Sequence, residues 1–176
     1  MKNFKMFMLT AAICLTAAPF FNSCNDMTDD SAPTDNSGVA GTYKMTAFNI
    51  PGDAIDFDNN GTSSNNLVSE SDCFNSNLLR LNSDHTYLRV DNYIDLSSGV
   101  AACAEFSETG VWTKDGDVVT TTSSTSNGYE SYQTSYDYNS GSGTMTLAAP
   151  NFTYPTIDSG SQTTAVGDVN FVFTKQ

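Results

Sequence analysis

The chain has 176 residues, enough for one domain with a sizeable hydrophobic core. Its formal net charge is -13, yet only 15% of its residues are charged, and Ser, Thr, Asn and Gly supply most of its polarity. Seven Lys and Arg residues are too few for the basic patch that phosphate groups require, which argues against a nucleic-acid partner.

Residues 1–23 have the features of a secretory signal peptide. A basic start with two lysines precedes a largely apolar stretch from Met6 to Phe21, which is short for a transmembrane helix. Ser23 stands before Cys24 as in bacterial lipoprotein signals, which predicts that Cys24 becomes the lipid-modified first residue. Ordinary secretion with a free Cys24 is the alternative.

Residues 24–38 are predicted to be a flexible tether, because they are polar, contain proline and glycine, and lack apolar periodicity. The run Asn25–Asp30 resembles the acidic signal that directs lipoproteins of the Bacteroidetes to the outer face of the cell. The sequence therefore predicts an outer-membrane lipoprotein of the cell envelope, exposed at the surface and attached to the membrane by its lipid. A solvated linker explains the same acidic residues.

Residues 39–176 are predicted to form one β domain. Val39–Phe48 alternates between two faces as a first strand does. The following stretch, residues 50–72, has few apolar side chains and no period, which is unusual in a compact domain and is often functional.

This stretch contains the first half of a calcium-binding loop. Oxygen-bearing side chains stand at alternate positions, and Gly61 permits the sharp turn. Leu67 occupies the position where the motif has a bidentate Glu, and Asp, Asn and Gly are also plain turn formers, so a solvated turn stays the alternative. The candidate calcium ligands are Asp56, Asp58, Asn60 and Thr62.

The centre of the chain predicts a β-hairpin. Leu78–Leu81 and Thr86–Tyr93 alternate as strands and are joined by a polar turn at Asp84-His85. His85 is interpreted as a solvated turn residue and not as a catalyst. Cys73 and Cys103 flank this hairpin.

Of the four cysteines, two are expected to remain as a pair in the mature chain. Cys14 leaves with the signal peptide and Cys24 takes the lipid, so Cys73 and Cys103 remain in an oxidising compartment, where a disulfide is the default. The loop of about 30 residues that it closes corresponds to roughly 3–4 kcal/mol of stabilisation.

The second half of the chain predicts further strands joined mostly by tight turns. Residues 149–167 are expected to be a long loop, because they contain Pro150 and Pro155. The expected strands are 104–113, 118–123, 129–138, one around Met145 and Leu147, and a last one with Val169, Phe171 and Phe173.

About eight antiparallel strands and no convincing helix predict an all-β protein with a single up-and-down barrel. Closure of such a sheet removes its exposed edges. An eight-stranded barrel has an interior just large enough for packed side chains or one small ligand.

The arrangement resembles the lipocalin-like lipoproteins of the Bacteroidetes, a calycin-like barrel family. The resemblance implies a barrel with a small apolar ligand and does not imply a reaction. The residues that carry it are Gly41-Thr42-Tyr43, Asp56-x-Asp58-x-Asn60-Gly61, Cys73, Asp84-His85-Thr86-Tyr87, Cys103 and Gly110-Val111-Trp112.

The leading functional hypothesis is a non-enzymatic binding module that holds a small apolar ligand inside its barrel. Aromatic side chains offer large apolar contact area, although the same side chains can simply fill the core. The candidate lining residues are Trp112, Tyr132, Tyr136, Tyr138, Phe171 and Phe173.

A second hypothesis is a surface interaction or structural protein. In that case the long polar loops 50–72 and 149–167 recognise a macromolecule or a glycan. No nucleophile–base motif and no P-loop appears, so no enzymatic activity and no cofactor are expected, apart from the calcium ion considered above.

Overall fold

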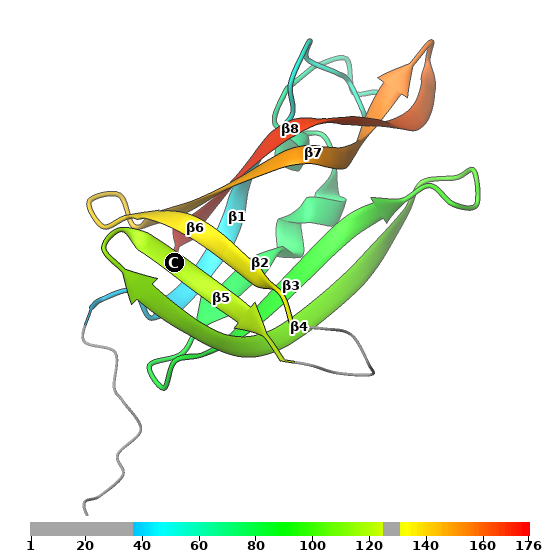
Figure 1. Ribbon diagram of the computed structural model, residues 1–176. Helices are drawn as coiled ribbons and strands as arrows, with labels where there is room; N and C mark the ends of the chain where they lie inside the picture. The colour runs from blue at the N-terminus through cyan, green and yellow to red at the C-terminus, as the bar shows by residue number, and fades with distance from the viewer. Residues whose placement is uncertain (1–36, 125–130) are drawn as a thin grey trace, which may run out of the picture. The chain divides into compact units, whose positions relative to one another are not determined.

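The computed structural model describes residues 37–124 and 131–176, which form one closed antiparallel barrel of eight strands (Figure 1). The strands follow one another around the barrel in chain order, and β8 pairs with β1. This confirms the predicted all-β up-and-down barrel. The strands are β1 (Gly41–Asn49), β2 (Leu78–Leu81), β3 (Thr86–Asp95), β4 (Ala102–Asp115), β5 (Val118–Ser123), β6 (Gln133–Asn139), β7 (Thr144–Asp158) and β8 (Ser161–Lys175).

Several sequence predictions fall outside the described residues. They are the signal peptide 1–23, the lipidation site Cys24, nearly all of the tether 24–38, and the first two residues of the predicted strand 129–138. Within the described part of the chain, no helix combines the length and the hydropathy needed to cross a bilayer.

The up-and-down order gives the barrel two different ends. The β2–β3, β4–β5 and β6–β7 turns lie at one end, which we call the turn end. The long β1–β2 connection and the β3–β4 and β7–β8 turns lie at the other, which we call the loop end. At the turn end, glycine serves the β4–β5 turn, where Gly116 has a φ of 56°, a conformation that other residues rarely adopt.

The half of the barrel next to the turn end, which we call the turn half, owes its core to alternation along the strands. From Glu108 to Trp112 on β4, from Val119 to Ser123 on β5 and from Tyr136 to Tyr138 on β6, every second residue is buried, and the residues between them are exposed or half-buried. Gly110 is part of this pattern for a steric reason: a Cβ there would lie 2.0 Å from the carbonyl oxygen of Thr122 and 2.7 Å from the Tyr87 ring. Its lack of a side chain lets β5 and Tyr87 approach closely.

The prediction of a long loop over residues 149–167 is wrong. β7 and β8 form a long hairpin that pairs from Thr144↔Thr174 to Asp158↔Ser161 and is interrupted by a bulge between Ala149 and Phe152. Pro150 falls within this bulge, and Pro155 pairs with Thr164 on a stretch of β7 that is bonded to β8 alone in the described part of the sheet. Bulges and edge strands are where sheets tolerate proline, so the two prolines do not end the strand.

Residues 50–77 connect β1 to β2 and contain two short 3-10 helices, η1 (Leu67–Ser69) and η2 (Asp72–Ser76). Leu67 and Phe74 are buried and hold these helices against the barrel. As predicted, Cys73 of η2 forms a disulfide with Cys103 of β4, with 5.5 Å between their Cα atoms. The disulfide therefore ties the β1–β2 connection to the loop end of the β3–β4 hairpin.

Candidate functional site: a cavity at the loop end of the barrel

A cavity of about 470 Å³ lies between the β3–β4 and β7–β8 hairpins, which project from the loop end of the barrel (Figure 1). Strands β1, β3, β4, β7 and β8 and helix η2 all contribute side chains to its wall. The lining residues are Met45, Phe48, Phe74, Asn77, Arg89, Asp91, Asn92, Tyr93, Ile94, Phe106, Phe152, Thr153, Tyr154, Pro155, Thr164 and Phe171.

The apolar part of the wall is a set of contacting aromatic rings. Phe48 stands at its centre, with ring centroids 4.5 Å from Phe171 and 5.3 Å from Phe74. Phe152 packs edge-on against Phe171 at 5.3 Å. Edge-to-face and tilted packing at these distances is favourable, so the wall is well ordered without a ligand.

Three aromatic side chains of the wall remain accessible. Tyr93, Phe106 and Phe152 are 46%, 51% and 40% exposed, whereas Phe48 and Phe74 deeper in the wall are 4% and 2% exposed. Exposed aromatic residues beside a concave apolar surface are typical of a ligand entrance.

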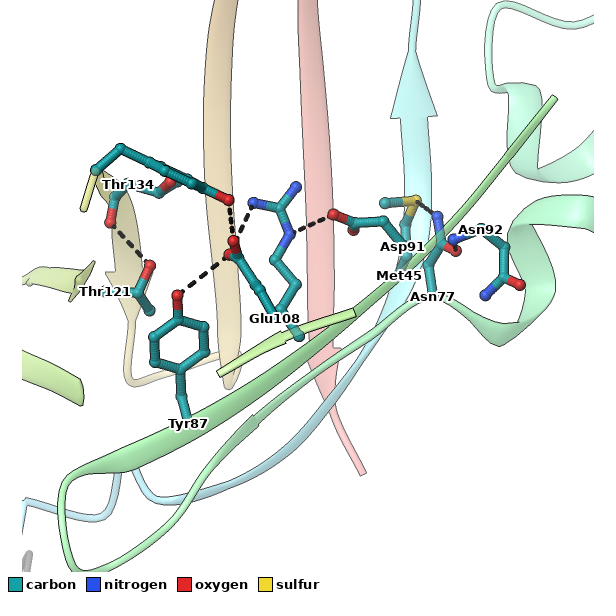
Figure 2. Close-up of polar contacts among 10 residues, drawn as sticks. Met45, Asn77, Tyr87, Asp91, Asn92, Glu108, Thr121 and Thr134 are labelled. Atoms are coloured by element: carbon teal, nitrogen blue, oxygen red, sulfur yellow. Dashed lines mark hydrogen bonds and ion pairs between the residues drawn. The ribbon is translucent and has the colours of Figure 1, made fainter. Parts of the chain in front are cut away.

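A charged cluster lies inside the barrel beside this aromatic wall. Arg89 Nε lies 2.7 Å from Asp91 Oδ2, and Arg89 Nη1 lies 3.9 Å from Glu108 Oε1. The side chains of Arg89, Asp91 and Glu108 are 18%, 22% and 7% exposed. Figure 2 shows Asp91 and Glu108 on opposite sides of the guanidinium. Arg89 and Asp91 line the cavity, and Glu108 lies beyond them, toward the turn half.

Glu108 is held by two tyrosines as well as by Arg89. The Tyr87 hydroxyl donates to Glu108 Oε1 at 3.2 Å, and the Tyr132 hydroxyl donates to Oε2 (Figure 2). Burial raises the pKa of Glu108, while Arg89 and Tyr87 oppose the rise. Burial and the nearby Glu108 carboxylate raise the pKa of Tyr87 far above its ordinary value, so Tyr87 keeps its proton and stays a donor.

Asp91 has one charged partner. Burial raises the pKa of its carboxyl, and the attraction of Arg89 works in the opposite direction. Its Oδ2 pairs with Arg89, while its Oδ1 has no donor in the described part of the chain. This oxygen is not among the fully buried atoms that lack a partner, so solvent or a ligand in the cavity can reach it.

Two asparagines complete the polar part of the wall. The backbone N–H of Asn92 donates to Asn77 Oδ1, and Asn77 Nδ2 contacts Met45 Sδ at 3.5 Å (Figure 2). The Asn92 side-chain Nδ2 is buried and has no hydrogen-bond partner among the described residues. Asn92 alternates with the inward Asp91 on β3 and is in register with the outward Glu105, so its side chain lies on the opposite face of the strand.

The structure places the six sequence-predicted lining residues in different environments. Phe171 lines the cavity. Trp112, Tyr136, Tyr138 and Phe173 are 7% exposed or less and pack in the core outside the cavity wall. Tyr132 is 48% exposed and contacts the site indirectly, through Glu108.

The polar residues of the site were missed by sequence reasoning, although a signal existed. Tyr87, Arg89 and Asp91 have the same parity on β3, and Glu108, Gly110 and Trp112 have the same parity on β4. Once Trp112 is taken as inward, the hairpin register Tyr87↔Gly110 and Arg89↔Glu108 turns the charged residues inward with it. Charged side chains do not count as core in a hydrophobic pattern, so the pattern alone passes over them.

The predicted turn residue His85 is half-buried and not fully solvated. Its ring stacks on Trp112 with 4.6 Å between centroids, and its backbone has a φ of 64°. Trp112 is fixed further because its Nε1 donates to the carbonyl oxygen of Asn82 at 2.9 Å. His85 thus covers the turn end of the core and does not line the cavity.

The candidate calcium loop forms a compact network of local hydrogen bonds. The carboxylate of Asp56 accepts from the backbone N–H groups of Asn60 and Gly61 at 2.9 Å each, and Asn60 Oδ1 accepts from the backbone N–H of Thr62 at 2.7 Å. Asp58 pairs with Asn60 as well. These are the contacts of a self-capped turn.

Glu70 joins this loop from the end of η1. It is 1% exposed, and its Oε2 accepts from the backbone N–H of Phe57 at 2.9 Å. One oxygen from each of Asp56, Asp58 and Glu70 lies within 4.8 Å of the others, a separation that a hard cation such as calcium could bridge. Calcium binding by Asp56, Asp58, Asn60 and Thr62 stays a prediction.

Fold and site together define a class: an eight-stranded up-and-down barrel with an aromatic cavity and a buried ion cluster at one end. Comparison of the chain with protein-family models, with curated proteins and with solved structures gave no match.

Proposed function

We propose that this chain is a non-enzymatic lipoprotein of the cell envelope that holds a small apolar ligand in the cavity of its barrel. The proposal extends the lipocalin-like resemblance from the fold to a binding role. The observation that carries it is the cavity of about 470 Å³ with its aromatic wall and accessible aromatic entrance. Small-molecule sites typically measure a few hundred Å³ and are lined by apolar groups with a few polar ones.

The wall composition supports binding over a purely structural role. A barrel that exists to be a rigid support has no physical need for three exposed aromatic side chains around a hollow, because they cost solubility. The alternative hypothesis, recognition through long polar loops, loses one of its two loops, since residues 149–167 belong to the β7–β8 hairpin.

The binding role is tested with N-phenyl-1-naphthylamine, a neutral apolar probe that fluoresces when it leaves water. Residues 37–176 should bind it saturably. Replacing Phe106 and Phe152 together with Ser should weaken binding by about tenfold or more, because each aromatic ring contributes on the order of 1 kcal/mol or more of apolar contact. Both side chains are about half exposed, so the barrel should keep its stability.

The matched control is the double variant Val111→Ser and Val166→Ser. These side chains are 53% and 64% exposed on β4 and β8 and lie outside the cavity wall. The control should bind the probe as the wild type does. Equal weakening in both variants, or fluorescence that never saturates, would contradict a defined site.

The membrane anchor is tested separately in cells. Cys24→Ala should move the protein from the membrane fraction to the soluble fraction of the envelope, because a lipid chain can no longer be attached. Retention of the variant in membranes would show that Cys24 is not the anchor. This outcome leaves the binding proposal standing, because the cavity is distant in sequence from Cys24.

A further inference from the structure

The polar groups of the cavity carry an unequal number of charges. One guanidinium, from Arg89, lies between two carboxylates, from Asp91 and Glu108. Among the described residues, these are the charged side chains of the cluster, so the cluster has one acidic group in excess. A second anion placed beside it would be repelled in a weakly screened interior.

The two carboxylates are not equally available. Glu108 is supplied with donors from Tyr87 and Tyr132 and lies behind the cavity wall. Asp91 lines the cavity and has Arg89 as its partner through Oδ2, which leaves Oδ1 for a donor brought by a ligand. The excess negative charge therefore lies where a ligand can reach it.

The guanidinium of Arg89 already faces two acids. Its Nε lies 2.7 Å from Asp91 Oδ2 without forming a hydrogen bond of good geometry, and its Nη1 lies 3.9 Å from Glu108 Oε1. A ligand carboxylate would have to compete with both acids for one guanidinium. A ligand cation can approach Asp91 through Oδ1 while Arg89 keeps its contact with Oδ2, and it adds the charge that the cluster lacks.

The aromatic residues at the opening of the cavity also favour a cationic ligand. Tyr93, Phe106 and Phe152 line the cavity and are partly exposed, and the face of an aromatic ring attracts cations by about 0.5–1 kcal/mol at exposed sites. The chain without its first 23 residues has five Lys and Arg against 20 Asp and Glu, which draws cations from solution toward the protein.

We propose that the ligand of this cavity is an apolar amine, whose protonated nitrogen pairs with Asp91 while its hydrocarbon part lies against Phe48, Phe152 and Phe171. The proposal rests on the proposed function and specifies the ligand class for the same site. Fatty acids, which share the tail and reverse the charge, are disfavoured.

The test is displacement of N-phenyl-1-naphthylamine by decylamine, decanol and decanoate at neutral pH, each below the concentration at which it forms micelles. The three compounds share one alkyl tail and differ in the charge of the head group. Decylamine should displace the probe at a concentration at least about tenfold lower than decanoate, with decanol between them. Equal displacement by decylamine and decanoate, or better displacement by decanoate, would overturn the proposal.

Asp91→Asn is the variant that isolates the carboxylate. It should raise the concentration of decylamine needed for half-displacement about tenfold or more and lower that of decanoate, while decanol is unchanged. Unchanged decanol displacement also shows that the variant keeps its fold. If decylamine displaces the probe equally well from wild type and Asp91→Asn, the proposed pair does not form.

Glu105→Gln is the matched control. Glu105 is an exposed acid on β4, in register with Asn92 of β3, so its replacement removes the same charge from the outside of the barrel. Decylamine displacement should be unaffected. A loss as large as that of Asp91→Asn would mean general attraction to an acidic protein and would contradict a specific pair. Failure of the wild type to bind the probe at all would instead contradict the proposed binding role.

Discussion

The two ends of the barrel use similar aromatic residues with opposite results. At the turn end Tyr43, Trp112, Tyr136 and Phe173 are all at most 1% exposed and make a solid core. At the loop end Tyr93, Phe106 and Phe152 are 40–51% exposed around a cavity. Aromatic content therefore does not decide whether a barrel is filled.

The pairing of the strands explains the difference. β5 pairs with β4 from Asp115 back to Gly110, and β6 pairs with β7 over Asp137–Asn139. Beyond these points the described parts of β4 and β7 are bonded to β3 and β8 respectively, so the sheet continues as two separate hairpins. Side chains from a closed ring of strands meet at the axis, whereas side chains on two separate hairpins leave space between them.

The largest expected difference between the two halves is the loss of stability when one aromatic residue in each is truncated. Trp112→Ala should lower the free energy of unfolding by about 3–5 kcal/mol, because it leaves a cavity, removes the stacking on His85 and removes one of the two donors to the Asn82 carbonyl. Phe106→Ala should change it by about 0.5 kcal/mol or less, since Phe106 is half exposed. Urea denaturation of both variants measures the two values.

Similar losses in the two variants would mean that the cavity wall is as tightly packed as the core. A ligand carried through purification could produce the same result, so the proteins should be delipidated before denaturation. The expected ratio then depends on burial alone.

The second prediction concerns the Cys73–Cys103 disulfide at the loop end. Cys73→Ser should lower the free energy of unfolding by roughly 3–4 kcal/mol, because the bond to Cys103 closes a 30-residue loop in the unfolded chain. Reduction of the wild type should produce a similar loss and should leave the variant unchanged. Thermal denaturation with and without reductant measures both effects.

A disulfide that stabilises only the segments next to it would give a different result. In that case the melting temperature would stay constant, and amide exchange would quicken in η2 and in the β4 residues near Cys103. Such an outcome would show that the loop end unfolds independently of the turn end.

The sequence predicted the fold better than the site for a reason visible in these two halves. Alternation indicates which residues of a strand share a face, and Leu79 and Leu81 on β2, and Tyr136 and Tyr138 on β6, are indeed buried together. Alternation says nothing about the position of a side chain along the barrel axis. Trp112 and Phe171 both face inward, yet one packs in the solid half and the other lines the cavity.

Two kinds of residue also mislead a reading of the pattern. Prolines suggested a loop where a bulge and a free strand edge accommodate them, as at Pro150 and Pro155. Charged residues suggested solvent where partners exist inside the barrel, as at Arg89 and Glu108. In both cases the deciding partner comes from another strand, and the linear sequence does not state which strands are neighbours.

The last prediction concerns Glu108, which lies between the solid half and the cavity. Its pKa is raised in the folded protein by burial, so the folded state binds a proton more readily than the unfolded state does. Wild-type stability should therefore contain a contribution that is present at pH values below the ordinary pKa of Glu and is lost as the pH rises through the raised pKa. A single proton gives a slope of up to about 1.4 kcal/mol per pH unit within that window.

Glu108→Gln removes this contribution and keeps an oxygen that can accept from Tyr87. The stability of the variant relative to wild type should therefore rise as the pH increases through the window, and Glu105→Gln, on the exposed face of the same strand, should show no such trend. Urea denaturation across mildly acidic pH measures the difference. A flat difference for Glu108→Gln would mean that Arg89 and the two tyrosines compensate fully for burial of the carboxylate. Glu108 would then ionise as readily in the folded as in the unfolded protein, and both acids of the cluster would carry charge at neutral pH.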